Sequence, residues 1–227
     1  MTTKANKSRG MPKRSSGPPP AQSQAKNRTW FLIGAGVFAL VIVAAIVAVA
    51  VAGGGGNRIS EPASDAIGIS GAALPALPTS GADPAVGRAI PTLSGKSLTG
   101  DPMTLGPTDG PAAIVILAHW CPHCQAEVPV LVNYLASTGM PDGVKMIGLT
   151  TSINRAQPNY PPSAWLKREG WTVPTLIDDA NSSALAALGI RNFPGFVFID
   201  ADGRVVQRRT GELPAATFHD IVSRLAP

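Results

Sequence analysis

Two cysteines separated by two residues are the feature of this 227-residue chain that is best suited to chemistry. The motif reads Trp120-Cys121-Pro122-His123-Cys124, and it contains all the cysteine in the sequence. A disulfide across so short a loop adds little to stability, and one pair cannot form a structural framework. The pair is better suited to redox exchange, in which one sulfur attacks a substrate and the other resolves the mixed disulfide.

The motif lies where a predicted buried strand passes into a predicted helix. The apolar run 112–118 precedes it, and Pro122 fits the first position of a helix, where the missing N–H costs nothing. A thiol at a helix N-terminus faces free N–H groups and the positive end of the helix dipole, and both favour the thiolate. We therefore expect Cys121 to attack, with help from protonated His123, and Cys124 to be the buried resolving thiol.

A metal site is the main alternative for a Cys-x-x-Cys pair. His119 and His123 lie close to Cys121 and Cys124, yet four ligands within six residues cannot surround one zinc ion, and there is no second pair. A copper site completed by His219 stays open, as does a metal-binding or metallochaperone role. We expect no metal, and no cofactor other than the Cys121–Cys124 disulfide itself.

The rest of the C-terminal part alternates between strand and helix patterns. After the motif, apolar residues recur at i, i+3, i+4 and i+7 from Val128, which predicts one face of a helix. The further expected elements are strands at 144–149 and 173–177, helices at 163–169 and 181–188, a hairpin of 196–199 with 205–209, and a helix after Pro214. This order predicts an α/β fold with a mixed central sheet.

The net charge of +5 belongs to the N-terminus. Residues 1–29 hold seven Lys and Arg and no acid, whereas basic and acidic residues balance from Pro84 onward. A neutral domain offers no electrostatic footprint for a nucleic acid, so we expect no such partner. The basic residues precede 23 residues without a charge, 30–52, long enough for a single-pass transmembrane helix.

The positive-inside rule then predicts the cell membrane as the location, with a disordered cytoplasmic tail (1–29) and the remainder of the chain across the membrane. A cleaved signal peptide is the alternative, although 23 residues exceed the usual apolar core of such peptides. Residues 53–83, rich in Gly, Pro and Ala, show no sustained period and predict a linker. The folded domain is expected to span 84–227.

The chain resembles the thioredoxin superfamily over about 86–225, and more narrowly the membrane-anchored TlpA/ResA/DsbE-like branch. Three blocks in the same order carry this resemblance: VGRAIPTLSGKSLTGDPMTL, AHWCPHCQAEVPVL and VPTLIDDANSSALAALGIRNFPGFVFIDADGRVVQRRTG. It implies a thioredoxin-like fold, with helices on both faces of the sheet. It also implies a thiol–disulfide oxidoreductase that acts on cysteine-containing exported proteins and exchanges electrons with a membrane redox partner.

The resemblance also assigns individual residues. Cys121 and Cys124 match the redox pair and Trp120 the aromatic residue beside it, while Phe193-Pro194 matches the cis-proline dipeptide that contacts bound peptide. Glu127 matches an acid near the pair. We expect Glu127, Pro122 and His123 to tune the redox reaction. For Glu127, an exposed acid favoured by the helix dipole is an equal alternative.

Three departures from the family pattern stand out, and the last of them bears on direction. Val115 occupies the position of thioredoxin's buried Asp, and Gly195 follows the cis-proline where Thr is usual. Pro122-His123 is the dipeptide of DsbA-type oxidants, and a group that stabilises the thiolate makes the disulfide a stronger oxidant. We therefore expect oxidative folding slightly more than the branch's reductive role toward apocytochrome c or other thiols.

Overall fold

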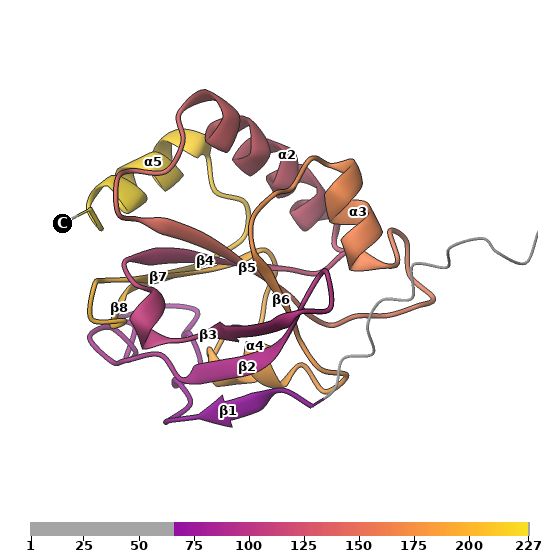
Figure 1. The fold of residues 1–227 in the computed structure, drawn as a ribbon. Helices are drawn as coiled ribbons and strands as arrows, with labels where there is room; N and C mark the ends of the chain where they lie inside the picture. The colour runs from indigo at the N-terminus through magenta and orange to yellow at the C-terminus, as the bar shows by residue number, and fades with distance from the viewer. Residues whose placement is uncertain (1–65, 227) are drawn as a thin grey trace, which may run out of the picture. The chain divides into compact units, whose positions relative to one another are not determined.

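The computed structural model describes residues 66–226 (Figure 1). Its elements, in chain order, are β1 (Gly68–Ser70), β2 (Thr92–Ser97), β3 (Pro102–Leu105), a 3-10 turn (Pro107–Asp109), β4 (Ala112–Leu117), α2 (Pro122–Ser137), β5 (Lys145–Thr150), α3 (Pro162–Arg168), β6 (Thr175–Ile177), α4 (Ser183–Ala187), β7 (Gly195–Ile199), β8 (Val205–Thr210) and α5 (Ala215–Ser223).

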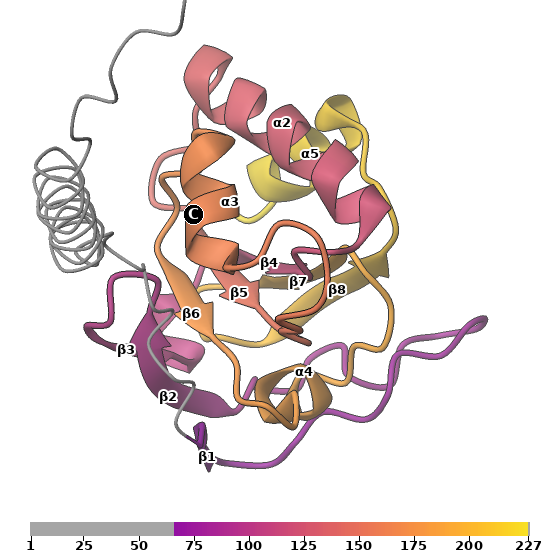
Figure 2. The same ribbon diagram turned by 90° about the vertical axis from the view of Figure 1, so that its right-hand side faces the viewer.

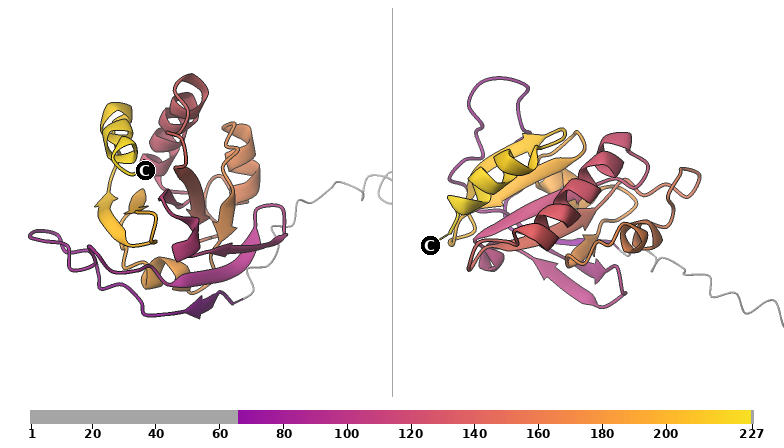
Figure 3. Two further views of the ribbon diagram at one scale, coloured as in Figure 1. Left: turned by 60° about the vertical axis from the view of Figure 1, so that its left-hand side comes forward. Right: turned by 90° about the horizontal axis from the view of Figure 1, so that it is seen from above.

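The strands form one mixed sheet in the order β1-β2-β6-β5-β4-β7-β8, with β3 paired to β2 as well. The neighbours β4, β5 and β6 are parallel, whereas the remaining pairs are antiparallel. Helices α2, α3 and α5 cover one face, and α4 with the N-terminal segment covers the other (Figures 2 and 3). The expected α/β architecture, with helices on both faces, is confirmed.

Strand β4 is the centre of this arrangement because every one of its six residues is buried. Alternate side chains of a strand point to opposite faces, so Ala113, Val115 and Leu117 pack toward α2 and α5. The intervening residues pack toward α4 in the second core cluster. The cysteine motif follows the carboxyl end of β4. In α/β sheets, ligands and substrates bind at the carboxyl ends of the parallel strands.

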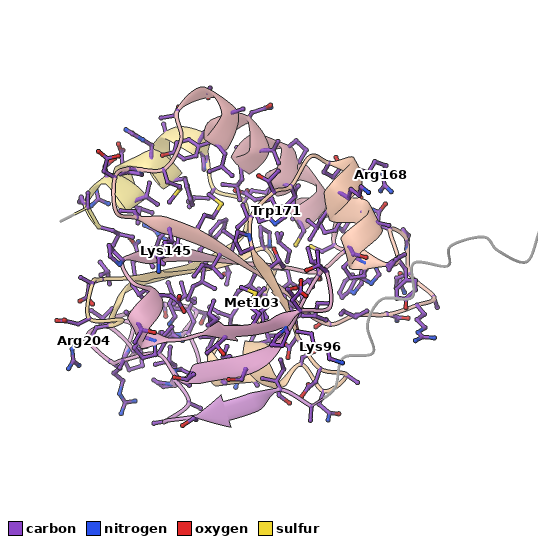
Figure 4. The ribbon with its side chains drawn as sticks, in the orientation of Figure 1. Lys96, Met103, Lys145, Arg168, Trp171 and Arg204 are labelled. Carbon is purple, nitrogen blue, oxygen red and sulfur yellow. The ribbon has the colours of Figure 1, made fainter. Side chains whose placement is uncertain are left out.

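Helix α3 closes one side of the larger core cluster. Its own residues Trp165 and Leu166 are buried, and Trp171, just after it, donates its indole N–H to Thr175 Oγ1 at 2.9 Å. Arg168, on the same helix, projects outward (Figure 4). The helix expected at 163–169 is therefore present, with bounds Pro162–Arg168, and it contacts the core.

The boundary expected near Pro84 is wrong, because the folded part begins earlier. Strand β1 pairs with β2, and Ile67 and Leu74 are buried in the smaller core cluster. These residues lie singly among Gly, Pro and Ala, so their contacts leave no periodic pattern in the sequence. Strands β2 and β3, within the opening block of the family resemblance, were likewise not among the expected elements.

One buried arginine fixes this N-terminal segment to the domain. The Arg208 side chain is fully buried and its Nε donates to Asp83 Oδ2 at 2.9 Å, while Nη1 donates to the carbonyls of Pro75 (2.9 Å) and Leu188 (2.8 Å). The hydrogen bonds from Arg208 hold the pKa of Asp83 below its usual value. A buried guanidinium is therefore satisfied only while the segment 75–83 lies in place.

The tail 1–29, the apolar segment 30–52 and residues 53–65 of the expected linker lie outside the described residues. Within 66–226, no helix is both long enough and apolar enough to cross a membrane. The membrane anchor therefore stays a prediction from the sequence.

We predict that Arg208→Met lowers the free energy of unfolding by about 2–4 kcal/mol, because it leaves the Asp83 carboxylate and two carbonyls without their donor. Urea denaturation of the chain from residue 66 onward measures this. The control Arg204→Met, on an exposed side chain of the final hairpin, should cost well under 1 kcal/mol.

The pH dependence provides a second check. Because the folded-state pKa of Asp83 is depressed, its contribution is present above the unfolded value of 3.8 and is lost as the pH falls through the folded value. The difference between wild type and Arg208→Met should shrink at acid pH. An undiminished difference there would mean that the ion pair is not its source.

Candidate functional site

Cys121 is the N-cap residue of α2, at the point where the chain leaves β4. The residue is 6% exposed, and its sulfur lies 3.9 Å from the carbonyl oxygen of Phe193. Pro122 occupies the first turn of the helix, as expected. The sulfur therefore lies at the positive end of the 16-residue helix, at the surface edge of the core.

Cys124 lies beneath it and is completely buried. Its sulfur accepts the backbone N–H of Ala118 at 3.4 Å. Burial raises the pKa of the Cys124 thiol strongly, and the nearby charges of Cys121 and Glu127 raise it further. Both cysteines are free thiols in the structure, so the geometry is that of the reduced pair.

Glu127 follows Cys124 by three residues, on the inner face of α2. It is 1% exposed, so the alternative of an exposed first-turn acid is wrong. Burial raises the pKa of its carboxyl to about 7, and the charge of Glu212 adds to the rise. The Leu213 N–H, which donates to Oε2 at 2.9 Å, has the opposite effect and lowers the pKa. Oε1 has no hydrogen-bond partner within the described part of the chain.

His123 faces outward and pairs with a residue that the sequence did not single out. Its Nδ1 lies 2.6 Å from Glu212 Oε1, and the two side chains are 68% and 51% exposed. Glu212 and Leu213 follow β8, so one short loop contacts both His123 and Glu127. No motif marks this loop, and only its place after the final hairpin could have pointed to it.

The predicted substrate-binding residues lie together beside Cys121. The Phe193-Pro194 peptide bond is cis, as the resemblance implied, and two further X-Pro bonds, Gly110-Pro111 and Tyr160-Pro161, are cis as well. The Trp120 ring meets Phe193 edge-on, with centroids 6.1 Å apart at 88°. Trp120 is partly buried and its indole N–H donates to the Ser152 carbonyl at 2.8 Å.

The histidines weighed as metal ligands have other contacts. Both ring nitrogens of His119 contact backbone groups. His219, on α5, lies near Tyr134 of α2 and Ser223 of α5. Among residues 66–226, no group of three or more His, Cys, Asp and Glu side chains is arranged to hold a metal ion. Val115, at the position of thioredoxin's buried acid, lies in the same apolar cluster as Cys124.

Comparison with known proteins agrees with this geometry. The family model described as Redoxin matches residues 85–225. A thiol:disulfide interchange protein DsbE from Vibrio cholerae is 30% identical over 115 residues, which cover 51% of this chain and 58% of that protein. The thioredoxin domain of a thiol-disulfide oxidoreductase from Bacteroides vulgatus superposes with a TM-score of 0.51 at 18% identity, covering 63% of this chain and 99% of that domain.

The structural likeness shows a thioredoxin-like fold, and the family match spans more than half of the chain. The described residues place a free cysteine pair at the start of a helix on that fold. The chain therefore belongs to the Redoxin family, and its residues 85–225 form a thiol–disulfide oxidoreductase domain of the thioredoxin superfamily.

Proposed function

We propose that the whole protein is a membrane-anchored, extracytoplasmic thiol–disulfide oxidoreductase that exchanges disulfides with cysteine-containing exported proteins. One observation carries the proposal: Cys121, which keeps a small exposed area of 6%, caps a helix directly above the fully buried Cys124, and a buried acid, Glu127, lies on the same helix. This is the asymmetry that exchange needs, with one sulfur that meets substrate and one that resolves.

In the oxidative direction, a client thiolate attacks Cys121 Sγ of the Cys121–Cys124 disulfide. The bond between the two cysteines breaks, and the electron pair leaves on Cys124. A second client thiolate then attacks the client sulfur, which breaks the mixed disulfide and releases the Cys121 thiolate. The client loses two electrons, and the cysteine pair gains them. A membrane redox partner that reoxidises the pair completes the cycle.

Glu127 supplies the proton that this step requires. The Cys124 thiolate is unstable in the core, where burial raises its pKa, so it must be protonated as it leaves. Oε2 of Glu127 accepts the Leu213 N–H, so the proton of the neutral acid belongs on Oε1. A carboxyl with a pKa of about 7 can give a proton in oxidation and take it back in reduction, which suits general acid–base catalysis near neutral pH.

The anchor and the location follow from the sequence. Residues 30–52 are apolar and are preceded by a basic tail, which supports a cytoplasmic N-terminus and an external domain. The related Vibrio cholerae protein is a thiol:disulfide interchange protein, which supports disulfide exchange as the activity of this chain. Nothing in the neutral domain favours a nucleic acid partner.

For direction, we propose oxidation of clients ahead of reduction. The helix N-terminus and His123 both favour the Cys121 thiolate, which stabilises the reduced protein and strengthens the disulfide as an oxidant. Glu212 opposes this effect, because its carboxylate lies 2.6 Å from Nδ1 of His123 and compensates the charge that the ring gains when it is protonated. A reductive role toward apocytochrome c or other external thiols is the alternative, and the pairing with Glu212 is the observation that favours it.

The first prediction from the proposed function concerns the roles of the two thiols. Cys124→Ser should accumulate mixed disulfides with exported proteins, because the resolving sulfur is absent while Cys121 stays reachable. Cys121→Ser should trap few, since Cys124 is completely buried. Non-reducing gels of membrane extracts, followed by identification of the trapped proteins, measure both. Equal trapping by the two variants would contradict the assignment.

A second prediction concerns Glu127. The rate at which a preformed mixed disulfide with Cys121 is resolved by Cys124 should rise with pH around a midpoint near 7, as Glu127 becomes able to accept a proton. Glu127→Gln should remove this midpoint and slow resolution about 100-fold above pH 7. Stopped-flow measurement of the released thiol gives the rates. An unchanged pH profile in Glu127→Gln would exclude the proton-transfer role.

The same substitution tests the buried charge through stability. Because the folded-state pKa of Glu127 is raised, the folded protein binds the extra proton between about pH 4.5 and 7, and stability falls as the pH rises through that window. Glu127→Gln should therefore equal wild type near pH 4.5 and exceed it by up to roughly 3 kcal/mol at pH 8. Urea denaturation at the two pH values measures the difference.

A third prediction concerns direction. We expect the reduction potential to lie above roughly −180 mV, well above the roughly −270 mV of thioredoxin. At pH 6, His123→Gln should lower the potential and Glu212→Gln should raise it, each by tens of millivolts, since 30 mV corresponds to about 1.4 kcal/mol. In the double variant, the effect of Glu212→Gln should largely vanish. A wild-type value below about −250 mV would favour the reductive role instead.

A further inference from the structure

His119 connects the active-site turn to the loop between β5 and α3, residues 151–161, here called the β5–α3 loop. The imidazole is fully buried, two residues before Cys121. Its Nδ1 lies 2.7 Å from the Pro158 carbonyl oxygen, and its Nε2 lies 3.1 Å from the Asn154 backbone nitrogen. One ring therefore holds both ends of the segment 154–158.

The chemistry of these partners sets the protonation of the ring. The carbonyl of Pro158 can only accept a hydrogen bond, and the backbone N–H of Asn154 can only donate one. The proton of His119 therefore lies on Nδ1, and Nε2 is the acceptor. In this state the ring is neutral, so it holds the loop without adding a charge beside Cys121.

The backbone of His119 extends the same connection. Its carbonyl oxygen accepts from Asn159 Nδ2 at 3.4 Å and from Gln125 Nε2, on α2, at 3.1 Å. The Tyr160 ring approaches the imidazole edge-on, with centroids 6.0 Å apart. His119, in the turn that precedes Cys121, thus contacts both the β5–α3 loop and the start of α2.

The β5–α3 loop needs such support. Residues 154–158 are exposed, and Ser152 and Asn159 adopt positive φ angles of 51° and 62°, which non-glycine residues rarely adopt. Arg168 Nη2, on α3, also donates to Asn159 Oδ1, at 2.7 Å. The conformation at the two ends of the loop persists because neighbouring groups impose it.

Trp120 links the β5–α3 loop to the surroundings of the Cys121 sulfur. The indole N–H donates to the carbonyl of Ser152, at the start of the loop, and the ring packs edge-on against Phe193, beside the cis-proline. Trp120 is therefore held between the β5–α3 loop and the segment that contacts Cys121. A displacement of the loop would remove the acceptor that orients the indole.

We propose that His119 is a positioning residue for client binding: its neutral imidazole fixes the β5–α3 loop as a wall of the client site and thereby orients Trp120 beside Cys121. The inference rests on the proposed function, because it assigns the wall that a client polypeptide meets while its cysteine reacts. It separates the two histidines: the exposed His123, paired with Glu212, is the one proposed to tune the potential, whereas the buried His119 governs affinity for a polypeptide.

Three substitutions of His119 test this in the full chain. His119→Leu removes both side-chain bonds, His119→Asn keeps a donor for Pro158, and His119→Gln keeps an acceptor for Asn154. The matched control is His219→Leu, on an exposed histidine of α5. The assay is oxidation of a synthetic peptide with two cysteines, with glutathione disulfide as the terminal oxidant, and it gives KM and kcat.

We expect KM for the peptide to rise roughly fivefold for each bond removed, with His119→Leu worst and His119→Asn and His119→Gln intermediate. The reduction potential and the rate at which iodoacetamide alkylates Cys121 should stay unchanged, because a small reagent does not use the wall. Amide hydrogen exchange within 153–160 should accelerate in the same order. His219→Leu should match wild type in all four measurements.

An unchanged peptide KM in His119→Leu would overturn the proposal, as would a shift of the potential equal to that of His123→Gln. Asn and Gln variants no better than Leu would show that only the packing of the ring matters, which also overturns it. If wild type oxidises no peptide, the proposed function fails, and hydrogen exchange within 153–160 still decides whether His119 holds the loop.

Discussion

The burial of the Cys124 thiol beneath the first turn of α2 is the constraint on which the site depends. A thiolate there is strongly disfavoured, as the raised pKa of Cys124 records, so exchange requires a proton donor and acceptor inside the protein. Val115 leaves the adjoining strand without an acid, and Glu127 is the acid on the inner face of the same helix. One helix therefore carries the two sulfurs and the acid that we propose as the proton carrier.

The residues in and around the motif are held by two loops that lie outside it. The Leu213 N–H occupies one oxygen of Glu127, and the adjacent Glu212 compensates His123, so one loop after β8 influences both the buried acid and the exposed histidine. On the opposite side, the β5–α3 loop meets His119 and Trp120. The two loops belong to segments far apart in the sequence, and the sheet places both at the carboxyl end of β4.

The sequence predicted the features that have a local signature. Continuous apolar runs predicted β4 and β5, and the Asp202-Gly203 turn predicted the final hairpin. The 3.6-residue period predicted the buried faces of α2 and α5. It did not decide whether Glu127 is buried, because an acid in an early helical turn fits either environment. Glu212 acts from 89 positions away, and His119 binds backbone groups, which leave no trace in residue type. The segment 66–83 contacts the domain through isolated residues such as Leu74, so composition alone indicated a linker.

In the proposed cycle, the ability to exchange disulfides and the direction of that exchange depend on different parts of the molecule. The proton on Glu127 can move either way, because a pKa of about 7 places both forms within reach near neutral pH. The buried half of the site thus serves oxidation and reduction alike. In the proposed cycle the two directions differ in the surroundings of Cys121, namely the helix N-terminus and the exposed His123–Glu212 pair. Exposed charges can change without disturbing the core, so direction is the property of this fold that surface substitutions alter most readily.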